Sequence, residues 1–70
     1  MKITLNGKDM ETEGSSLRDI LIQEKIIEDP RQVYGIAVTV NEKIVSKKNI
    51  ASFEIAEGDI IEVFTMVAGG

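Results

Sequence analysis

The fold of this chain is restricted most by the fact that only one segment, residues 16–25, has the apolar spacing of a sizeable helix. Its apolar face is formed by three residues: Leu17, Ile20 and Leu21. Ser16 is a favourable N-cap residue, and Asp19 places an acid in the first turn. We expect the helix to end near Lys25, with Ile26-Ile27 packed in a non-helical turn. One helix can cover only one face of a sheet, so the other face is left open or is covered by loops.

The N-terminal segment predicts a β-hairpin. Residues 2–6 alternate between apolar and polar side chains, and so do residues 8–12, in which Met10 and Thr12 point inward. The two segments are joined by Asn6-Gly7, the strongest short-range hairpin signal. The first two strands are therefore expected to be antiparallel neighbours.

The middle of the chain predicts a second hairpin between two polar segments. We expect a loop over Glu28–Gln32, because the residue before a proline avoids the helical region. Tyr34–Asn41 alternates as a strand, and Asn41-Glu42 turns the chain into a short returning strand, Lys43–Val45. Ser46–Asn49 follows as a polar loop. Its two lysines could contact an acidic partner or a phosphate, although they are more typical of a solvated loop, which we favour for both polar segments.

The last third of the chain leads into a final strand. Three apolar residues without clean periodicity are expected to pack on the core from a loop and a 3₁₀ turn: Ile50, Phe53 and Ile55. Glu57–Asp59 predicts a tight turn, and Ile60–Phe64 predicts the strand.

The order of these elements predicts the topology. The first and last strands are far apart in the sequence, yet both are apolar enough to be central. Pairing them in parallel, with the helix across one face, buries the most apolar surface. The predicted fold class is therefore α+β. We expect a β-grasp (ubiquitin-like) domain over residues 1–64, with a mixed sheet of four to five strands and one main helix on one face. Residues 65–70 would form a flexible C-terminal tail.

The final strand carries apolar side chains on both faces. Because Glu62 belongs outside, we place Ile61 and Val63 in the core. Ile60 and Phe64 then share the open face with Glu62 and form an exposed apolar patch, which is typical of a partner surface. The patch is flanked by two small residues of the neighbouring strand: Ala37 and Thr39. The alternative is that loop residues fold over this patch.

Composition excludes several classes of function. The chain has no cysteine, no histidine and no tryptophan, so thiolate chemistry, the commonest general base and the commonest metal ligand are missing. We therefore predict no metal site, no bound cofactor and no catalytic residue. The net charge of −4 argues against nucleic acid. The N-terminus lacks the apolar core of a signal peptide, and no apolar run approaches membrane-spanning length, so a cytoplasmic location is expected.

The chain closes on two glycines, which add nothing to a core. Residues without a Cβ allow a tail to enter a narrow channel. The Gly70 carboxylate can therefore reach another protein's active site and be the group that reacts there. The residues that would lead up to it are Met66, Val67, Ala68 and Gly69. Small residues are also common at disordered termini, so the glycines alone favour neither interpretation.

Four blocks, spread over nearly the whole chain, follow one known pattern: Ile3–Lys8, Val38–Val45, Glu57–Phe64 and Val67–Gly70. They resemble, in order, the first hairpin, the VNxxxV hairpin, the GDxxExF-type final strand and the terminal AGG of the ThiS family, the bacterial sulfur carrier proteins of thiamine biosynthesis. The family often has a tryptophan where this chain has Ile50, which implies a repacked local core. Related MoaD-type carriers of molybdopterin synthesis tend to be longer and often have prolines where this chain has Thr65–Val67.

The resemblance implies a carrier, not an enzyme. A ThiF-type adenylyltransferase would use ATP and magnesium to activate the Gly70 carboxylate as an acyl adenylate. Sulfur from a cysteine desulfurase or another persulfide donor would then displace AMP and leave a thiocarboxylate. A ThiG-type thiazole synthase would accept that sulfur. Phe64, Ile60 and Glu62 would contact the partners. The alternatives are a MoaD-like carrier, a ubiquitin-like modifier joined to lysines through the same terminus, and an interaction domain whose glycines are incidental.

Overall fold

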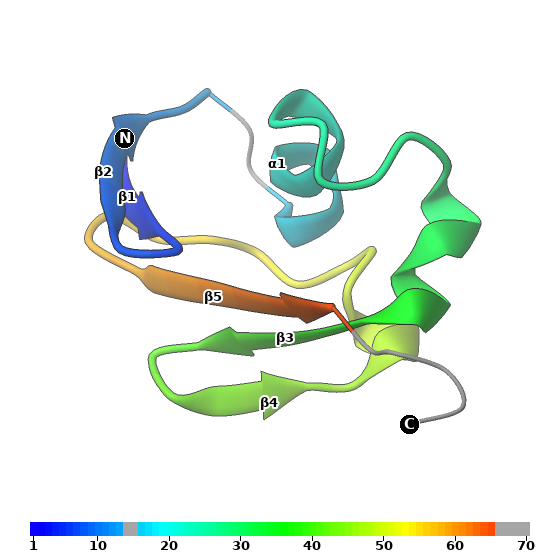
Figure 1. The fold of residues 1–70 in the computed structure, drawn as a ribbon. Helices are drawn as coiled ribbons and strands as arrows, with labels where there is room; N and C mark the ends of the chain where they lie inside the picture. Colours follow the sequence, from blue (N-terminus) through cyan, green and yellow to red (C-terminus); the bar gives the residue numbers. More distant parts are fainter. Residues whose placement is uncertain (14–15, 66–70) are drawn as a thin grey trace.

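The computed structural model describes residues 1–13 and 16–65 as a five-stranded mixed sheet with one α-helix (Figure 1). The helices and strands are, in chain order, β1 (Lys2–Leu5), β2 (Lys8–Glu11), α1 (Leu17–Gln23), the 3₁₀ helix η1 (Pro30–Gly35), β3 (Ile36–Val40), β4 (Lys43–Val45), the 3₁₀ helix η2 (Lys47–Asn49) and β5 (Ile60–Thr65). The strand order is β2-β1-β5-β3-β4.

The N-terminal hairpin is confirmed. β1 and β2 are antiparallel, with Leu5 opposite Lys8 and Lys2 opposite Glu11. Asn6 and Gly7 both have positive φ, at 51° and 82°. This is the backbone of a type I′ turn, which matches the twist of the flanking strands and is favoured by an Asn-Gly pair.

Helix α1 begins and ends where the sequence indicates. The Ser16 side chain accepts a hydrogen bond from the backbone N–H of Asp19 at 3.1 Å, which caps the first turn. The helix ends at Gln23, and Lys25 has a φ of 61°, in the left-handed region that terminates helices. Its three core residues are completely buried: Leu17, Ile20 and Leu21.

The predicted loop over Glu28–Gln32 is wrong, because Pro30–Gly35 forms the 3₁₀ helix η1. The Asp29 side chain accepts a hydrogen bond from the Arg31 N–H at 2.8 Å, and Gln32 Oε1 accepts one from the Asp29 N–H at 2.9 Å. This reciprocal capping satisfies the backbone donors at the start of the helix. The helix also takes two residues from the predicted strand, so β3 spans Ile36–Val40.

The second hairpin is confirmed and is tied to the turn before β5. Asn41 and Glu42 both have positive φ, at 53° and 72°, and join β3 to β4. The Asn41 Nδ2 group donates to Asp59 Oδ1 at 2.9 Å, and Asn41 Oδ1 accepts from the Ile60 N–H at 3.0 Å. The turn at Gly58 has a φ of 86°, as a tight Gly turn requires. The predicted polar loop Ser46–Asn49 contains the short helix η2.

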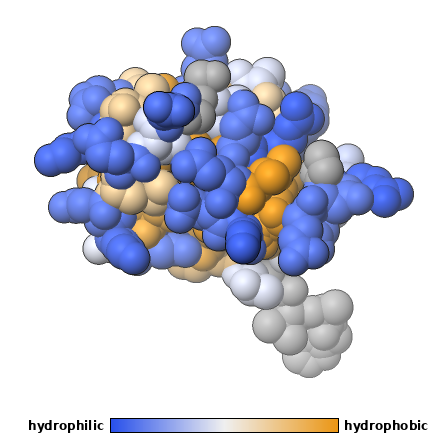
Figure 2. All heavy atoms as spheres, turned by 90° about the horizontal axis from the view of Figure 1, so that it is seen from above, coloured by the Kyte–Doolittle hydropathy of each residue, from blue (hydrophilic) through white to orange (hydrophobic). Residues whose placement is uncertain are grey.

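The central parallel pairing, and with it the β-grasp topology, is confirmed. Thr4 and Leu5 of β1 pair in parallel with Ile60 and Ile61 of β5, and β5 continues antiparallel to β3. One face of this sheet packs on α1, and the loop residues Ile50 and Ile55 complete the core, as predicted. The rest of the core comes from Ile3, Ile27, Val33, Ile36, Val38, Val40 and Val45. Seen from above, the surface is largely hydrophilic, with hydrophobic residues showing between the polar ones (Figure 2).

Candidate functional site

The candidate site begins on β5, whose two faces differ sharply in burial. Ile61 is 0% exposed, and Val63 is half-buried and packs against the core. Ile60 and Phe64, which point the opposite way, remain 49% and 53% exposed. The predicted assignment of the two faces is therefore confirmed, and the alternative in which loop residues cover Ile60 and Phe64 is excluded for the part of the chain that the structure describes.

The apolar surface extends across β3 to the edge strand β4. Ala37 lies opposite Phe64, and Thr39 lies between Glu62 of β5 and Ile44 of β4. Ile44 is 80% exposed. We call Ile44, Ile60, Glu62 and Phe64 the open-face patch. Three large apolar side chains on one uncovered sheet face are typical of a surface that binds another protein.

Ile44 is a site residue that the sequence analysis missed. The sequence contained the information needed to find it, because the two-residue turn Asn41-Glu42 fixes the register of the hairpin. That register pairs Thr39 with Ile44, so Ile44 lies on the open face once Val38 is placed in the core.

Two hydrogen bonds between Asn6 and β5 hold this strand in place as it approaches Phe64. Asn6 is the first residue after β1. Its backbone N–H donates a hydrogen bond to the Ile61 carbonyl at 2.9 Å, and its Oδ1 atom accepts one from the Val63 N–H at 2.8 Å. The side chain thus replaces the backbone partner that the short strand β1 does not provide. It satisfies a donor of β5 that would otherwise lose its ladder hydrogen bond.

Thr39 lies between the strands that carry the open-face patch and allows a prediction about stability. Its Oγ1 is buried and finds no hydrogen-bond partner among the described residues. An unsatisfied buried hydroxyl is unfavourable, whereas a methyl group of the same shape is not. Thr39→Val is therefore expected to raise the free energy of unfolding by about 1 kcal/mol, measured by urea denaturation. The matched control is Thr65→Val, at an exposed position of the same sheet. Lower stability in Thr39→Val would contradict the unpaired hydroxyl.

The predicted tail residues lie outside the described residues: Met66, Val67, Ala68, Gly69 and Gly70. The last described residue, Thr65, is still paired with Ile36, so β5 runs one residue beyond the predicted strand. Since β5 is the central strand, the C-terminal segment starts from the middle of the sheet (Figure 1). The functions assigned to these five residues remain predictions.

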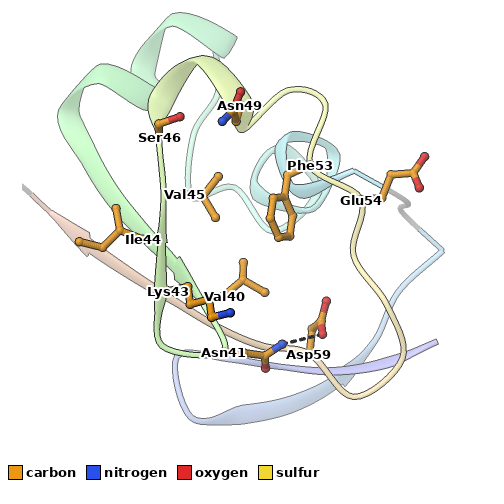
Figure 3. A pocket seen from close by; sticks show the side chains of 10 residues that line it. All are labelled: Val40, Asn41, Lys43, Ile44, Val45, Ser46, Asn49, Phe53, Glu54 and Asp59. Atoms are coloured by element: carbon orange, nitrogen blue, oxygen red, sulfur yellow. Dashed lines mark hydrogen bonds between the residues drawn. The ribbon is translucent and has the colours of Figure 1, made fainter.

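A hollow borders the edge strand β4. It has a volume of about 520 Å³ and lies between β4 and the segment before β5. Val40, Val45 and Phe53 point into it, whereas Ile44 points away (Figure 3). The hydrogen-bonded pair of Asn41 and Asp59 closes one end, near the start of β5.

The described residues do not gather the side chains that commonly hold a metal ion. Residues 1–13 and 16–65 contain no group of three or more histidine, cysteine, aspartate or glutamate residues that could hold a metal ion. The pKa of the Asp29 carboxyl lies below its ordinary value, because the Arg31 side chain and backbone N–H donate hydrogen bonds to it. This pair is on the surface, away from the patch. No helix in the described ranges is long and apolar enough to cross a membrane.

Comparison with known proteins gives one consistent family. The model of the ThiS family matches residues 3–70. A Thermus thermophilus protein named sulfur carrier protein ThiS is 26% identical over 68 residues, which is 97% of this chain and 98% of that protein. The crystal structure of the thiamine biosynthesis protein ThiS from Geobacter metallireducens has a TM-score of 0.80 at 22% identity and covers both chains completely. A solution structure of a thiamine biosynthesis protein from the same organism has a TM-score of 0.72 at 22% identity and covers all of this chain and 88% of its own.

Proposed function

The chain belongs to the ThiS family, and we propose that it is a sulfur carrier protein of thiamine biosynthesis, with the sulfur held on Gly70. The single observation that carries the proposal is the family match over residues 3–70, which includes the diglycine end. The absence of cysteine from the sequence fits this chemistry, since the sulfur would be held on the C-terminal carboxylate and not on a side chain.

The proposed chemistry follows from the poor reactivity of a carboxylate. A Gly70 carboxylate oxygen attacks the α-phosphorus of ATP in a ThiF-type enzyme, and magnesium pyrophosphate leaves. The terminal sulfur of a persulfide then attacks the acyl carbon, and AMP leaves. The chain is then joined to the donor through a new C–S bond. A second thiol cleaves the persulfide's original S–S bond by forming a disulfide with the donor sulfur, and the thiocarboxylate is released. A ThiG-type thiazole synthase consumes this thiocarboxylate. ATP and magnesium belong to the partner enzyme.

The part of this chain in the reaction is presentation. Five residues follow Thr65 and span at most about 18 Å when extended. The partner's active site must therefore lie within that distance of the end of β5. The open-face patch lies on β4 and β5 and includes Phe64, the residue directly before Thr65. We propose that it docks against the adenylyltransferase and places the tail in the active site.

Truncation of Phe64 tests the docking surface. Phe64→Ala is expected to weaken the affinity for the ThiF-type enzyme by about 30-fold, because it removes a central aromatic contact. The free energy of unfolding should fall by only about 1 kcal/mol or less, since the ring is 53% exposed. Affinity is measured by calorimetry and stability by urea denaturation. Ile22→Ala, on the exposed side of α1, is the matched control. Unchanged affinity with a large loss of stability would assign Phe64 to the core instead.

The pathway is tested by offering the sulfur to two acceptors. The thiocarboxylated chain is incubated separately with a thiazole synthase and with the large subunit of molybdopterin synthase, and the loss of sulfur from the chain is followed by mass spectrometry. We expect the chain to lose its sulfur only in the incubation with the thiazole synthase. Transfer only to the molybdopterin enzyme would instead identify a MoaD-like carrier. A stable amide bond to lysines of other proteins would identify a modifier.

A further inference from the structure

Four basic side chains from three separate helices line one hollow. Arg18 comes from α1, Arg31 from η1, and Lys47 and Lys48 from η2, and Tyr34 forms part of the same wall. The hollow has a volume of about 260 Å³, and we call it the basic hollow. Tyr34 is 71% exposed, so the wall it forms faces solvent.

The basic hollow is unusual for this chain, which is acidic overall. It gathers four of the eight lysine and arginine residues in a sequence with a net charge of −4. None of the residues that line it is acidic. Asp29, which does not line it, pairs with Arg31 at 3.0 Å. A lining with four basic side chains and no acidic one makes this region attractive to anions.

The topology places the basic hollow at the end of the sheet from which the C-terminal segment starts. η1 leads directly into Ile36, which pairs with Thr65. η2 begins two residues after Val45, which lies opposite Val38 near the same end. Figure 1 shows η1, η2 and the tip of β5 on one side of the molecule.

We propose that the basic hollow binds an acidic surface of the enzyme that activates the C-terminus, next to the channel that receives the tail. This inference rests on the proposed function. The tail spans up to about 18 Å beyond Thr65, so Gly70 can react deep inside the enzyme while the domain remains at the channel entrance. With the tail extended in this way, the basic residues would meet protein side chains and not the nucleotide. Such contacts steer association more than they add affinity.

Charge reversal tests the proposal. Lys47→Glu/Lys48→Glu is compared with Lys8→Glu/Lys43→Glu, which changes the net charge equally but on the two edge strands. Glutamate at the start of a helix is favourable, so η2 should tolerate the change, which melting temperatures verify. The association rate with a purified ThiF-type adenylyltransferase is measured by stopped flow. We expect it to fall about tenfold in the Lys47/Lys48 variant at low salt and much less in the control.

The outcomes separate the two proposals. The difference between the variants should vanish at about 1 M salt, where the Debye length is about 3 Å. If both variants associate with the enzyme at equal rates and the wild-type chain is adenylated normally, the proposal for the basic hollow is overturned and the proposed function stands. A change confined to the KM for ATP would mean that the hollow holds phosphate and would also overturn the proposal. A wild-type chain that is not adenylated would overturn the proposed function, and this inference with it.

Discussion

Addition of a single alanine after Gly70 is expected to abolish ATP-dependent activation of the chain while leaving its melting temperature unchanged. The added residue moves the carboxylate by about 3.5 Å and gives the new terminal residue a Cβ. Misplacement of a reacting group by even 1 Å can reduce a rate by about 100-fold, so a loss of at least that size is expected. Pyrophosphate release with a ThiF-type enzyme measures the effect.

The control uses the same molecule. Carboxypeptidase removes the added alanine and should restore activation, which distinguishes a blocked terminus from a damaged domain. Full activation of the extended chain would contradict the carrier proposal, because the reactive carboxylate would then not need to belong to Gly70.

The second large effect is expected in the core, from two neighbouring residues of β5. Ile61 is 0% exposed and pairs with Leu5 and Val40 in the middle of the sheet. Ile61→Ala is expected to lower the free energy of unfolding by about 3 to 4 kcal/mol through lost burial and the cavity left behind. A small domain has about 5 kcal/mol in total, so this variant should keep only about 1 to 2 kcal/mol. Urea denaturation followed by circular dichroism measures the change.

Ile60→Ala removes the same atoms from the opposite face and serves as the matched variant. Because Ile60 is 49% exposed, a loss of about 1 kcal/mol or less is expected. Equal losses in the two variants would contradict the assignment of the two faces of β5.

The sequence predicted most of the fold because local signals and the global topology agree. The turn between the first two strands needs positive φ angles, which Asn6-Gly7 adopts readily. Ser16 accepts a hydrogen bond from the backbone N–H of Asp19, which the helix itself leaves without a partner. A single charged residue, Glu62, separates the two apolar faces of β5. With one helix available, the face without Glu62 is the one that α1 covers.

The helix η1 was missed because a correct rule was extended too far. Asp29, the residue before the proline, is indeed extended, with φ −127° and ψ 135°. The rule says nothing of the residues after the proline, and Pro30 suits the first position of a helix. Asp29 followed three residues later by Gln32 was a readable capping pattern.

The basic hollow could not be predicted because it exists only in three dimensions. Lys47 and Lys48 are adjacent in the sequence and alone resemble a solvated loop. Arg18 and Arg31 join them only because α1 and η1 pack next to η2. The unpaired hydroxyl of Thr39 is similar, since its burial depends on neighbours from two other strands.

The most direct test of the carrier proposal is the intact mass of the purified chain after incubation with ATP, magnesium, a ThiF-type adenylyltransferase and a persulfide donor. We expect a mass increase equal to the replacement of one oxygen by sulfur, which fragmentation assigns to Gly70 if the chain is a sulfur carrier. An unchanged mass, with no AMP adduct on the chain, would contradict that proposal.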